Sequence, residues 1–89
     1  MQRKLDFDVF CAKVLSILEV DWNDPCRRDV RIFEDMGLDS LETFELLVVI
    51  ESLAELFVPL PEVPLIFTLG DAFDYYEVAC TAAESDELR

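Results

Sequence analysis

Two helix-start signals, one at residues 39–42 and one at residues 68–71, constrain the fold of this chain more than any other feature. Asp39 is followed three residues later by Glu42, and Thr68 is followed three residues later by Asp71. In this arrangement the first side chain accepts a hydrogen bond from a first-turn amide, and the acid reaches back to the amide of the capping residue. We therefore expect one helix to begin at residue 40 and another at residue 69.

The first half of the chain holds one segment with apolar residues at helical spacing. It covers residues 7–20, and Asp6 is well placed to cap its start. The stretch that follows, up to Gly37, has no clean period, so we expect a long connection that apolar residues pin to the core. The predicted core residues are Phe7, Phe10, Val14, Ile17 and Leu18 in the helix, and Val30, Ile32 and Phe33 in the connection.

A proline-rich segment limits the second helix. Because Pro59 and Pro61 forbid continuation, and the residue before a proline is biased away from helix, this helix should end near Leu56 or Phe57. Residues 60–67 then allow one short helical turn at most. The predicted core face of the second helix consists of Thr43, Leu46, Ile50, Leu53 and Phe57.

The last helix is expected over residues 69–82, followed by a frayed polar tail at 83–89. Three main helices plus one short turn, with no alternating strand pattern, predict an all-α bundle. A chain of 89 residues can bury one small core, so residues 1–89 should form a single domain. The predicted core face of the last helix consists of Leu69, Ala72, Phe73, Tyr76 and Cys80.

The charge of the chain is strongly negative and unevenly distributed. Twenty acidic residues face seven basic ones, which gives a formal net charge of −13, and no basic residue occurs from Ile32 to Leu88. Such a surface repels nucleic acid and anionic lipid, and it would attract a basic patch on another protein. The alternative is that the acidity only keeps a small hydrophobic protein in solution.

Neither membrane insertion nor catalysis is indicated by the sequence. The longest uninterrupted apolar run is Leu46–Ile50, too short to span a membrane, so we expect a soluble cytoplasmic protein. There is no histidine, and Cys11, Cys26 and Cys80 lack the spacing of a zinc site or a disulfide framework, so we expect reduced thiols and no metal. The chain also lacks a glycine-rich phosphate-binding motif, and we do not expect an enzyme.

The second helix carries an unusual arc opposite its predicted core face. Apolar side chains alternate there with carboxylates, which produces a partly apolar stripe with an acidic rim. Periodicity alone fits two interpretations, namely further core around a central helix or an exposed docking surface for a partner. The residues of this arc are Ser40, Leu41, Phe44, Glu45, Val48, Glu51 and Glu55.

Ser40 is the one polar residue whose position suggests a specific chemistry. It follows the turn at residues 36–39 and opens a long helix, so its hydroxyl lies near free amides and the positive end of the helix dipole. That environment favours an attached phosphate. Ordinary helix initiation also explains a serine at this position.

Three blocks of the sequence resemble the acyl carrier protein family. Residues 34–46, which read EDMGLDSLETFEL, are similar to the family signature, an acidic turn that ends in Gly-x-Asp-Ser-Leu at the start of the second helix. Val58-Pro59 resembles the Ile-Pro pair after that helix, and residues 68–76 resemble the Thr-Val-x-x-Ala-Ile-x-Tyr opening of the family's last helix. The spacing between the blocks needs no gaps, and the resemblance covers about residues 7–80.

The resemblance implies that Ser40 carries 4′-phosphopantetheine, which a separate phosphopantetheinyl transferase transfers from coenzyme A. The thiol of this group would hold acyl chains as thioesters, and the protein would deliver them to enzymes of fatty-acid or polyketide-type biosynthesis. Asp39 and Leu41 flank the attachment site in the same motif, and the pair Leu38-Asp39 is typical of acyl rather than peptidyl carriers.

The resemblance also implies how partners would bind. In this family, acyl-transferring and ketosynthase-type enzymes use basic patches to bind the second helix. The arc on the second helix would then be a docking surface, and the protein would be a discrete, monomeric carrier. The implied docking residues are Leu41, Phe44, Glu45, Val48, Glu51 and Glu55.

Some features depart from the family pattern. Pro61 and Pro64 stand where a third helix usually lies, and Phe44 replaces a smaller aliphatic residue. These departures favour a specialised carrier of secondary metabolism. Two other interpretations stay open: a peptidyl carrier, which differs in cargo, and a non-acylated acidic helical adaptor, which would dock proteins without a prosthetic group.

Overall fold

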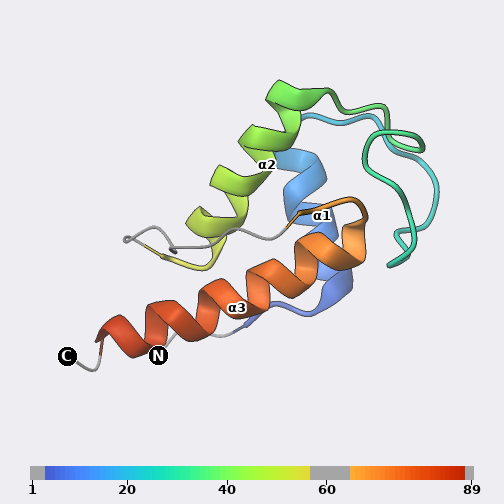
Figure 1. The fold of residues 1–89 in the computed structure, drawn as a ribbon. Helices are drawn as coiled ribbons and strands as arrows, with labels where there is room; N and C mark the ends of the chain where they lie inside the picture. Colours follow the sequence, from blue (N-terminus) through green and yellow to red (C-terminus); the bar gives the residue numbers. More distant parts are fainter. Residues whose placement is uncertain (1–3, 57–64, 88–89) are drawn as a thin grey trace.

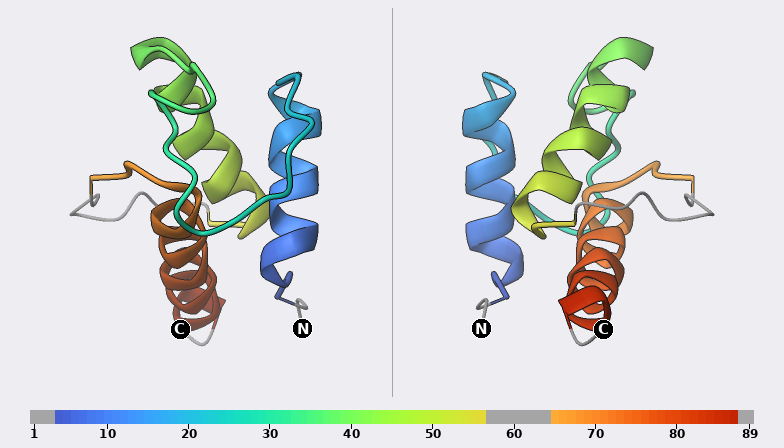
Figure 2. Two further views of the ribbon diagram at one scale, coloured as in Figure 1. Left: turned by 90° about the vertical axis from the view of Figure 1, so that its right-hand side faces the viewer. Right: turned by 90° about the vertical axis from the view of Figure 1, so that its left-hand side faces the viewer.

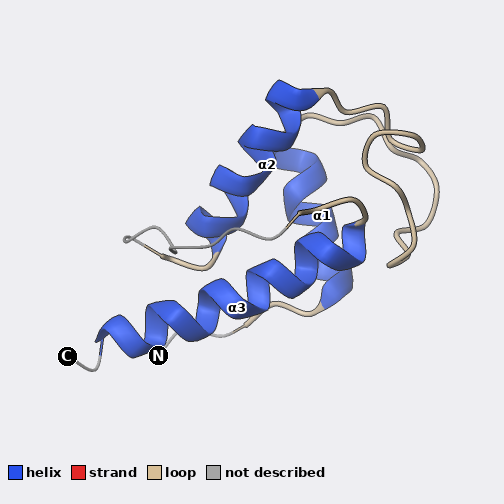
Figure 3. Cartoon of the chain, in the orientation of Figure 1, coloured by secondary structure: helices blue, strands red, loops and turns tan. Residues whose placement is uncertain are grey.

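The computed structural model describes residues 4–56 and 65–87 of the chain. These residues form three helices and no strand, namely α1 (Phe7–Ile17), α2 (Ser40–Leu53) and α3 (Leu69–Glu87) (Figure 1), and Figure 3 distinguishes the helices from the loops. Each helix contacts the other two, so the predicted all-α bundle is confirmed. The short helical turn expected within residues 60–67 lies outside the described residues, except for 65–67, which are not helical.

Local hydrogen bonds at the helix starts confirm the predicted capping. At α2, the Asp39 side chain accepts from the amide of Glu42 at 2.8 Å, and Glu42 Oε1 accepts from the amide of Asp39 at 3.1 Å. At α3, Thr68 Oγ1 accepts from the amide of Asp71 at 3.1 Å, and Asp71 Oδ2 accepts from the amide of Thr68 at 3.2 Å. At α1 the Asp6 side chain accepts from the amide of Val9 at 2.9 Å, without a reciprocal bond. Each start is defined by residues close together in the chain, which is why the sequence predicts it.

The ends of α1 and α2 were predicted too late. α1 ends at Ile17 and α2 at Leu53, each three residues or more before the expected end. Shortly after each helix a residue adopts a left-handed conformation, with a φ of 57° at Glu19 and 56° at Glu55. A left-handed residue just past a helix is a common terminator, so α2 stops before its prolines are reached.

α3 is longer than predicted and continues through Glu87. Residues 83–87, which were expected to belong to a frayed tail, are therefore helical. No glycine follows Gly70 and no proline follows Pro64, so the sequence contains no residue that would interrupt this helix. Ala83, one residue beyond the predicted end of the helix, is buried.

The core lies where the three helices meet. All five residues predicted on α3 are buried, and Phe10, Val14, Leu46 and Ile50 are buried on the other two helices, as predicted. Aromatic rings join α1 to α3, and the ring centroids of Phe10 and Tyr76 are 5.1 Å apart. Burial of these side chains is the main source of stability for so small a domain.

Six predicted core residues lie at the edge of the core or outside it, and two of these, Phe7 and Leu18 at the two ends of α1, are half-buried and pack against the core. Ile17 is 54% exposed because it lies in the last turn of α1, and Phe33 is 42% exposed beside the start of α2. Thr43 and Leu53 are only half-buried. Phe57 lies outside the described residues.

The long connection between α1 and α2 is pinned to the start of α3. Val30 and Ile32 are buried, as predicted. The amide of Ile32 donates to the carbonyl of Phe67 at 2.8 Å, and the amide of Leu69 donates to the carbonyl of Val30 at 2.9 Å. Figure 2 shows the connection passing from α1 across α3 before it rises to the start of α2. The turn that precedes Ser40 is therefore anchored to α3.

Gly70 lies where this connection meets α3. Its amide donates to the carbonyl of Arg28 at 2.9 Å, and a Cβ added to Gly70 would lie 2.9 Å from the same oxygen. Replacing Gly70 with Ala should lower the free energy of unfolding by about 1–3 kcal/mol, because the clashing atom belongs to the backbone and cannot easily move aside. Urea denaturation of Gly70→Ala, beside the exposed control Thr81→Ala, measures this loss. Equal midpoints for the two variants would show that the connection can shift away from α3 at little cost.

Candidate functional site

Ser40 is the first residue of α2, and it is exposed. The turn before it is anchored, because Leu38 is 5% exposed and its amide donates to the carbonyl of Ile32 at 3.1 Å. Gly37 has a φ of 74°, a left-handed conformation that glycine adopts without strain. The fold thus presents this serine to solvent at a well-anchored helix start.

The first turn of α2 contains backbone amides near Ser40 that the capping box does not use. The capping box uses the amides of Asp39 and Glu42, whereas the amides of Ser40 and Leu41 remain at the positive end of the helix dipole. Within residues 4–56 and 65–87, no hydrogen bond holds the Ser40 hydroxyl. The Ser40 hydroxyl is therefore accessible from solvent.

An apolar hollow opens beside Ser40. Its volume is about 370 Å³, and its walls come from the inner edge of α2, from the connection and from the segment before α3. Phe33 and Phe67, which are 42% and 58% exposed, form part of its rim. Leu65 and Leu47 were not singled out by the sequence, because neither shows a distinctive pattern. The lining residues are Phe33, Ser40, Thr43, Leu47, Leu65, Ile66 and Phe67.

The arc on the other side of Ser40 is a surface, not additional core. Leu41, Phe44 and Val48 are 66%, 63% and 52% exposed, which excludes the core interpretation for these three. Glu45 and Glu55 are exposed beside them. We call Leu41, Phe44 and Val48 the apolar stripe of α2. An exposed run of large apolar side chains with carboxylates at its edge is typical of an interaction surface.

Glu51 differs from the other carboxylates of the arc. It is half-buried, and its Oε2 accepts a hydrogen bond from the Tyr75 hydroxyl at 2.7 Å. Tyr75 is 1% exposed, and burial together with the nearby Glu51 carboxylate raises the pKa of its hydroxyl to about 12. Glu51 therefore links α2 to α3, a role that the sequence did not predict.

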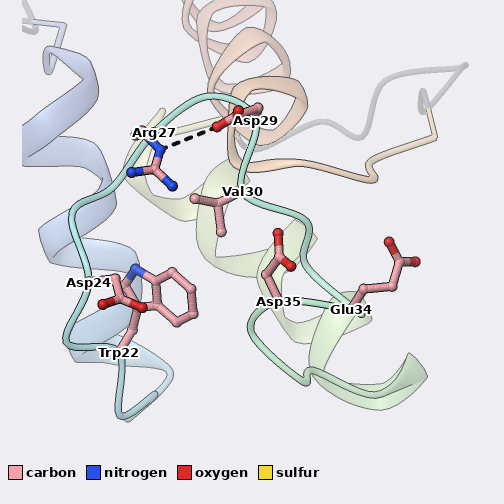
Figure 4. Close-up of a pocket in the computed structure, with 7 residues that line it drawn as sticks. All are labelled: Trp22, Asp24, Arg27, Asp29, Val30, Glu34 and Asp35. Atoms are coloured by element: carbon pink, nitrogen blue, oxygen red, sulfur yellow. Dashed lines mark ion pairs between the residues drawn. The ribbon is translucent and has the colours of Figure 1, made fainter.

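A second hollow, of about 390 Å³, lies on the connection and is strongly polar (Figure 4). Arg27 contacts Asp29 at 3.5 Å, and Asp35 is bound by Arg31, whose hydrogen bonds lower the pKa of the Asp35 carboxyl. Three charged side chains of the hollow are therefore already in ion pairs: Arg27 with Asp29, and Asp35 with the neighbouring Arg31. Among the residues that the structure describes, no group of His, Cys, Asp or Glu is arranged to hold a metal ion. The hollow is lined by Trp22, Asp24, Arg27, Asp29, Val30, Glu34 and Asp35.

A search for membrane-spanning helices and three comparisons with known proteins complete the description of the site. None of the helices in the described part of the chain has the length and apolar character needed to cross a membrane. Comparison with protein-family models, with curated proteins and with solved structures gave no match. Any functional assignment therefore has to rest on the residues and the geometry around Ser40.

Proposed function

We propose that this protein is an acyl carrier in which the Ser40 hydroxyl is the attachment point for 4′-phosphopantetheine. The observation that carries the proposal is the position of Ser40 between two different apolar surfaces. One is the hollow, to which α2 contributes Ser40, Thr43 and Leu47, and the other is the apolar stripe. These two rows are adjacent on the helix, because residues three or four positions apart lie side by side, as Ser40 and Phe44 do and as Phe44 and Leu47 do.

Each part of the site has a role in this proposal. Asp39 and Glu42 hold the helix start, so the serine keeps one position when a transferase binds. When bound, 4′-phosphopantetheine supplies a terminal thiol that carries acyl groups as thioesters. The hollow could shelter an apolar cargo near its attachment point, because its exposed walls are mainly aromatic and aliphatic.

The surface charge supports the proposed partners. Leu41 and Phe44 would provide apolar anchors, while Glu45 and Glu55 would attract a basic patch and orient it. The partners would be a phosphopantetheinyl transferase and acyl-transferring, ketosynthase-type enzymes of the cytoplasm. Glu51 contributes less to docking in this proposal, because its carboxylate is already engaged with Tyr75.

The test is covalent loading of the purified protein. We expect incubation with coenzyme A, magnesium and a broad-specificity phosphopantetheinyl transferase to increase the intact mass by one phosphopantetheinyl group. Ser40→Ala should show no increase, whereas Ser52→Ala, which changes another exposed serine of α2, should load like the unchanged protein. The reason is that only Ser40 combines the motif with a hydroxyl at the start of the helix.

The alternatives predict different results in the same experiment. No mass increase in a protein whose circular dichroism shows intact helices would reject the carrier and favour a non-acylated adaptor. Loading followed by transfer of amino acids, but not of acyl groups, would identify a peptidyl carrier.

A further inference from the structure

A third hollow lies at the C-terminal end of α2, next to the apolar stripe. Its volume is about 500 Å³. Two carboxylates share this hollow with two aliphatic side chains, one of which is the last residue of the stripe. We call the lining residues the acidic end of α2, and they are Val48, Glu51, Ser52, Glu55 and Leu56.

The carboxylates at this end of α2 have no counter-charge in the described part of the chain. Each of the five ion pairs found there uses a basic residue that precedes Ile32, and none of the acidic partners lies on α2. The acidic end of α2 is therefore complementary to a cationic side chain of another protein. An arginine suits it, because its aliphatic stem can cover Val48 and Leu56 while the guanidinium reaches the carboxylates.

One of the two carboxylates is not free to receive this cation. Glu51 is half-buried and its Oε2 accepts the Tyr75 hydroxyl at 2.7 Å, whereas Glu55 is exposed. Tyr75 is 1% exposed, so water has little access to replace the carboxylate as its hydrogen-bond partner. Turning Glu51 outward would therefore leave a buried hydroxyl without a partner, and such a group opposes the movement more than the loss of an exposed hydrogen bond does.

We infer that the acidic end of α2 binds an arginine side chain of a partner protein, and that the hydrogen bond from Tyr75 restrains this binding by holding Glu51 against α3. The bound guanidinium draws the Glu51 carboxylate outward, and the Tyr75 hydroxyl loses its acceptor. Docking is thereby coupled to the contact between α2 and α3. The inference deepens the proposed function, since it rests on the docking surface of α2 that this function uses.

The coupling acts in both directions. A partner that removes Glu51 from Tyr75 weakens the contact between the two helices, and a chain without the Tyr75 hydroxyl offers Glu51 to the partner at no such cost. Tyr75→Phe keeps the ring in the core and deletes only the hydroxyl. Tyr76→Phe is the matched control, because Tyr76 is 0% exposed and its hydroxyl accepts from the amide of Leu5, which precedes α1.

The experiment measures binding of a tetra-arginine peptide to the full chain by calorimetry at one fixed ionic strength. Tyr75→Phe should bind the peptide about tenfold more tightly than the unchanged protein, because no buried hydroxyl loses its partner. Tyr76→Phe should bind like the unchanged protein. In a Glu51→Gln background the effect of Tyr75→Phe should vanish, because no carboxylate is left to be released.

The tyrosine rings give a second readout by nuclear magnetic resonance. The chain contains only two tyrosines, so a protein with isotope-labelled tyrosine shows two sets of ring signals. Saturation with the peptide should shift the signals of Tyr75 and leave those of Tyr76 in place. Glu51→Gln should abolish the shift, because the peptide then has no carboxylate to draw away from Tyr75.

Other results would overturn the inference. Equal affinity in Tyr75→Phe and the unchanged protein would show that the hydrogen bond does not restrain binding, and weaker binding in Tyr75→Phe would show that Tyr75 holds Glu51 in the binding position. A peptide that does not bind would reject the arginine site, and Tyr75 signals that stay in place at saturation would reject the release. None of these measurements uses Ser40, so failed phosphopantetheine loading would reject the carrier without changing this result.

Discussion

Alkaline solution should unfold this protein in one transition between about pH 10 and pH 12. Tyr75 and Tyr76 are 1% and 0% exposed, and burial raises the pKa of each hydroxyl from an ordinary value of 10.0 to about 12. The Glu51 carboxylate beside Tyr75 acts in the same direction. Both side chains are thus tolerated in the core only while they are protonated.

The sign of the effect follows from linkage. Since the pKa of each tyrosine is higher in the folded protein, the unfolded chain loses its protons first, and rising pH favours unfolding. Their contribution to stability is complete below pH 10 and is lost as the pH approaches about 12. Each pKa difference corresponds to about 2.7 kcal/mol, so both together amount to about 5 kcal/mol. That is comparable to the whole stability of a small domain.

Two signals measured during the same titration test this prediction. The chain contains only two tyrosines, so tyrosinate absorbance reports these two residues alone. Absorbance and the loss of helical circular dichroism should change together, whereas the chain in concentrated urea should titrate near its ordinary pKa. Tyr75→Phe should weaken the pH dependence of stability by roughly half, because it removes one of two similar groups. Tyrosinate formation near pH 10 in a chain that stays helical would contradict the burial argument.

The sequence predicted the helix starts better than the helix ends. Capping involves residues three positions apart, so Asp39 with Glu42 and Thr68 with Asp71 are visible as local patterns. The end of α2 depends on a left-handed glutamate at position 55, and a glutamate has no marked preference for that conformation. Pro59 and Pro61 suggested a later end because they mark the last point to which α2 could extend, and the helix ends before that point.

The same distinction applies to the candidate site. Ser40 was proposed as a site from a continuous motif. For the apolar stripe the sequence left two interpretations open, and its exposure in the fold excludes the core. The contact of Glu51 with Tyr75 joins two helices, and the hollow joins α2 to the segment before α3. Contacts between distant segments leave no periodic signal, so they required the three-dimensional structure.

Under the proposed function, replacing Phe44 with Ala should reduce the efficiency of Ser40 loading roughly thirtyfold without changing the melting temperature. Phe44 is 63% exposed at the middle of the apolar stripe, so its removal leaves the core intact. An aromatic side chain that fills a partner's pocket typically contributes about 2 kcal/mol to binding, which corresponds to this change in kcat/KM. The measurement is the rate of phosphopantetheine transfer at limiting transferase and low carrier concentration.

A matched control separates docking from general hydrophobicity. Val78 is 56% exposed on α3, away from the stripe, so Val78→Ala should load at the original rate. Since the rim of the stripe is acidic, added salt should slow loading of the original protein and of both variants by a similar factor. An equal loss of loading rate in Phe44→Ala and Val78→Ala would mean that the transferase responds to the total exposed apolar surface and not to the apolar stripe. Unchanged loading in Phe44→Ala would place the docking surface elsewhere, and the hollow beside Ser40 would then be the next surface to alter.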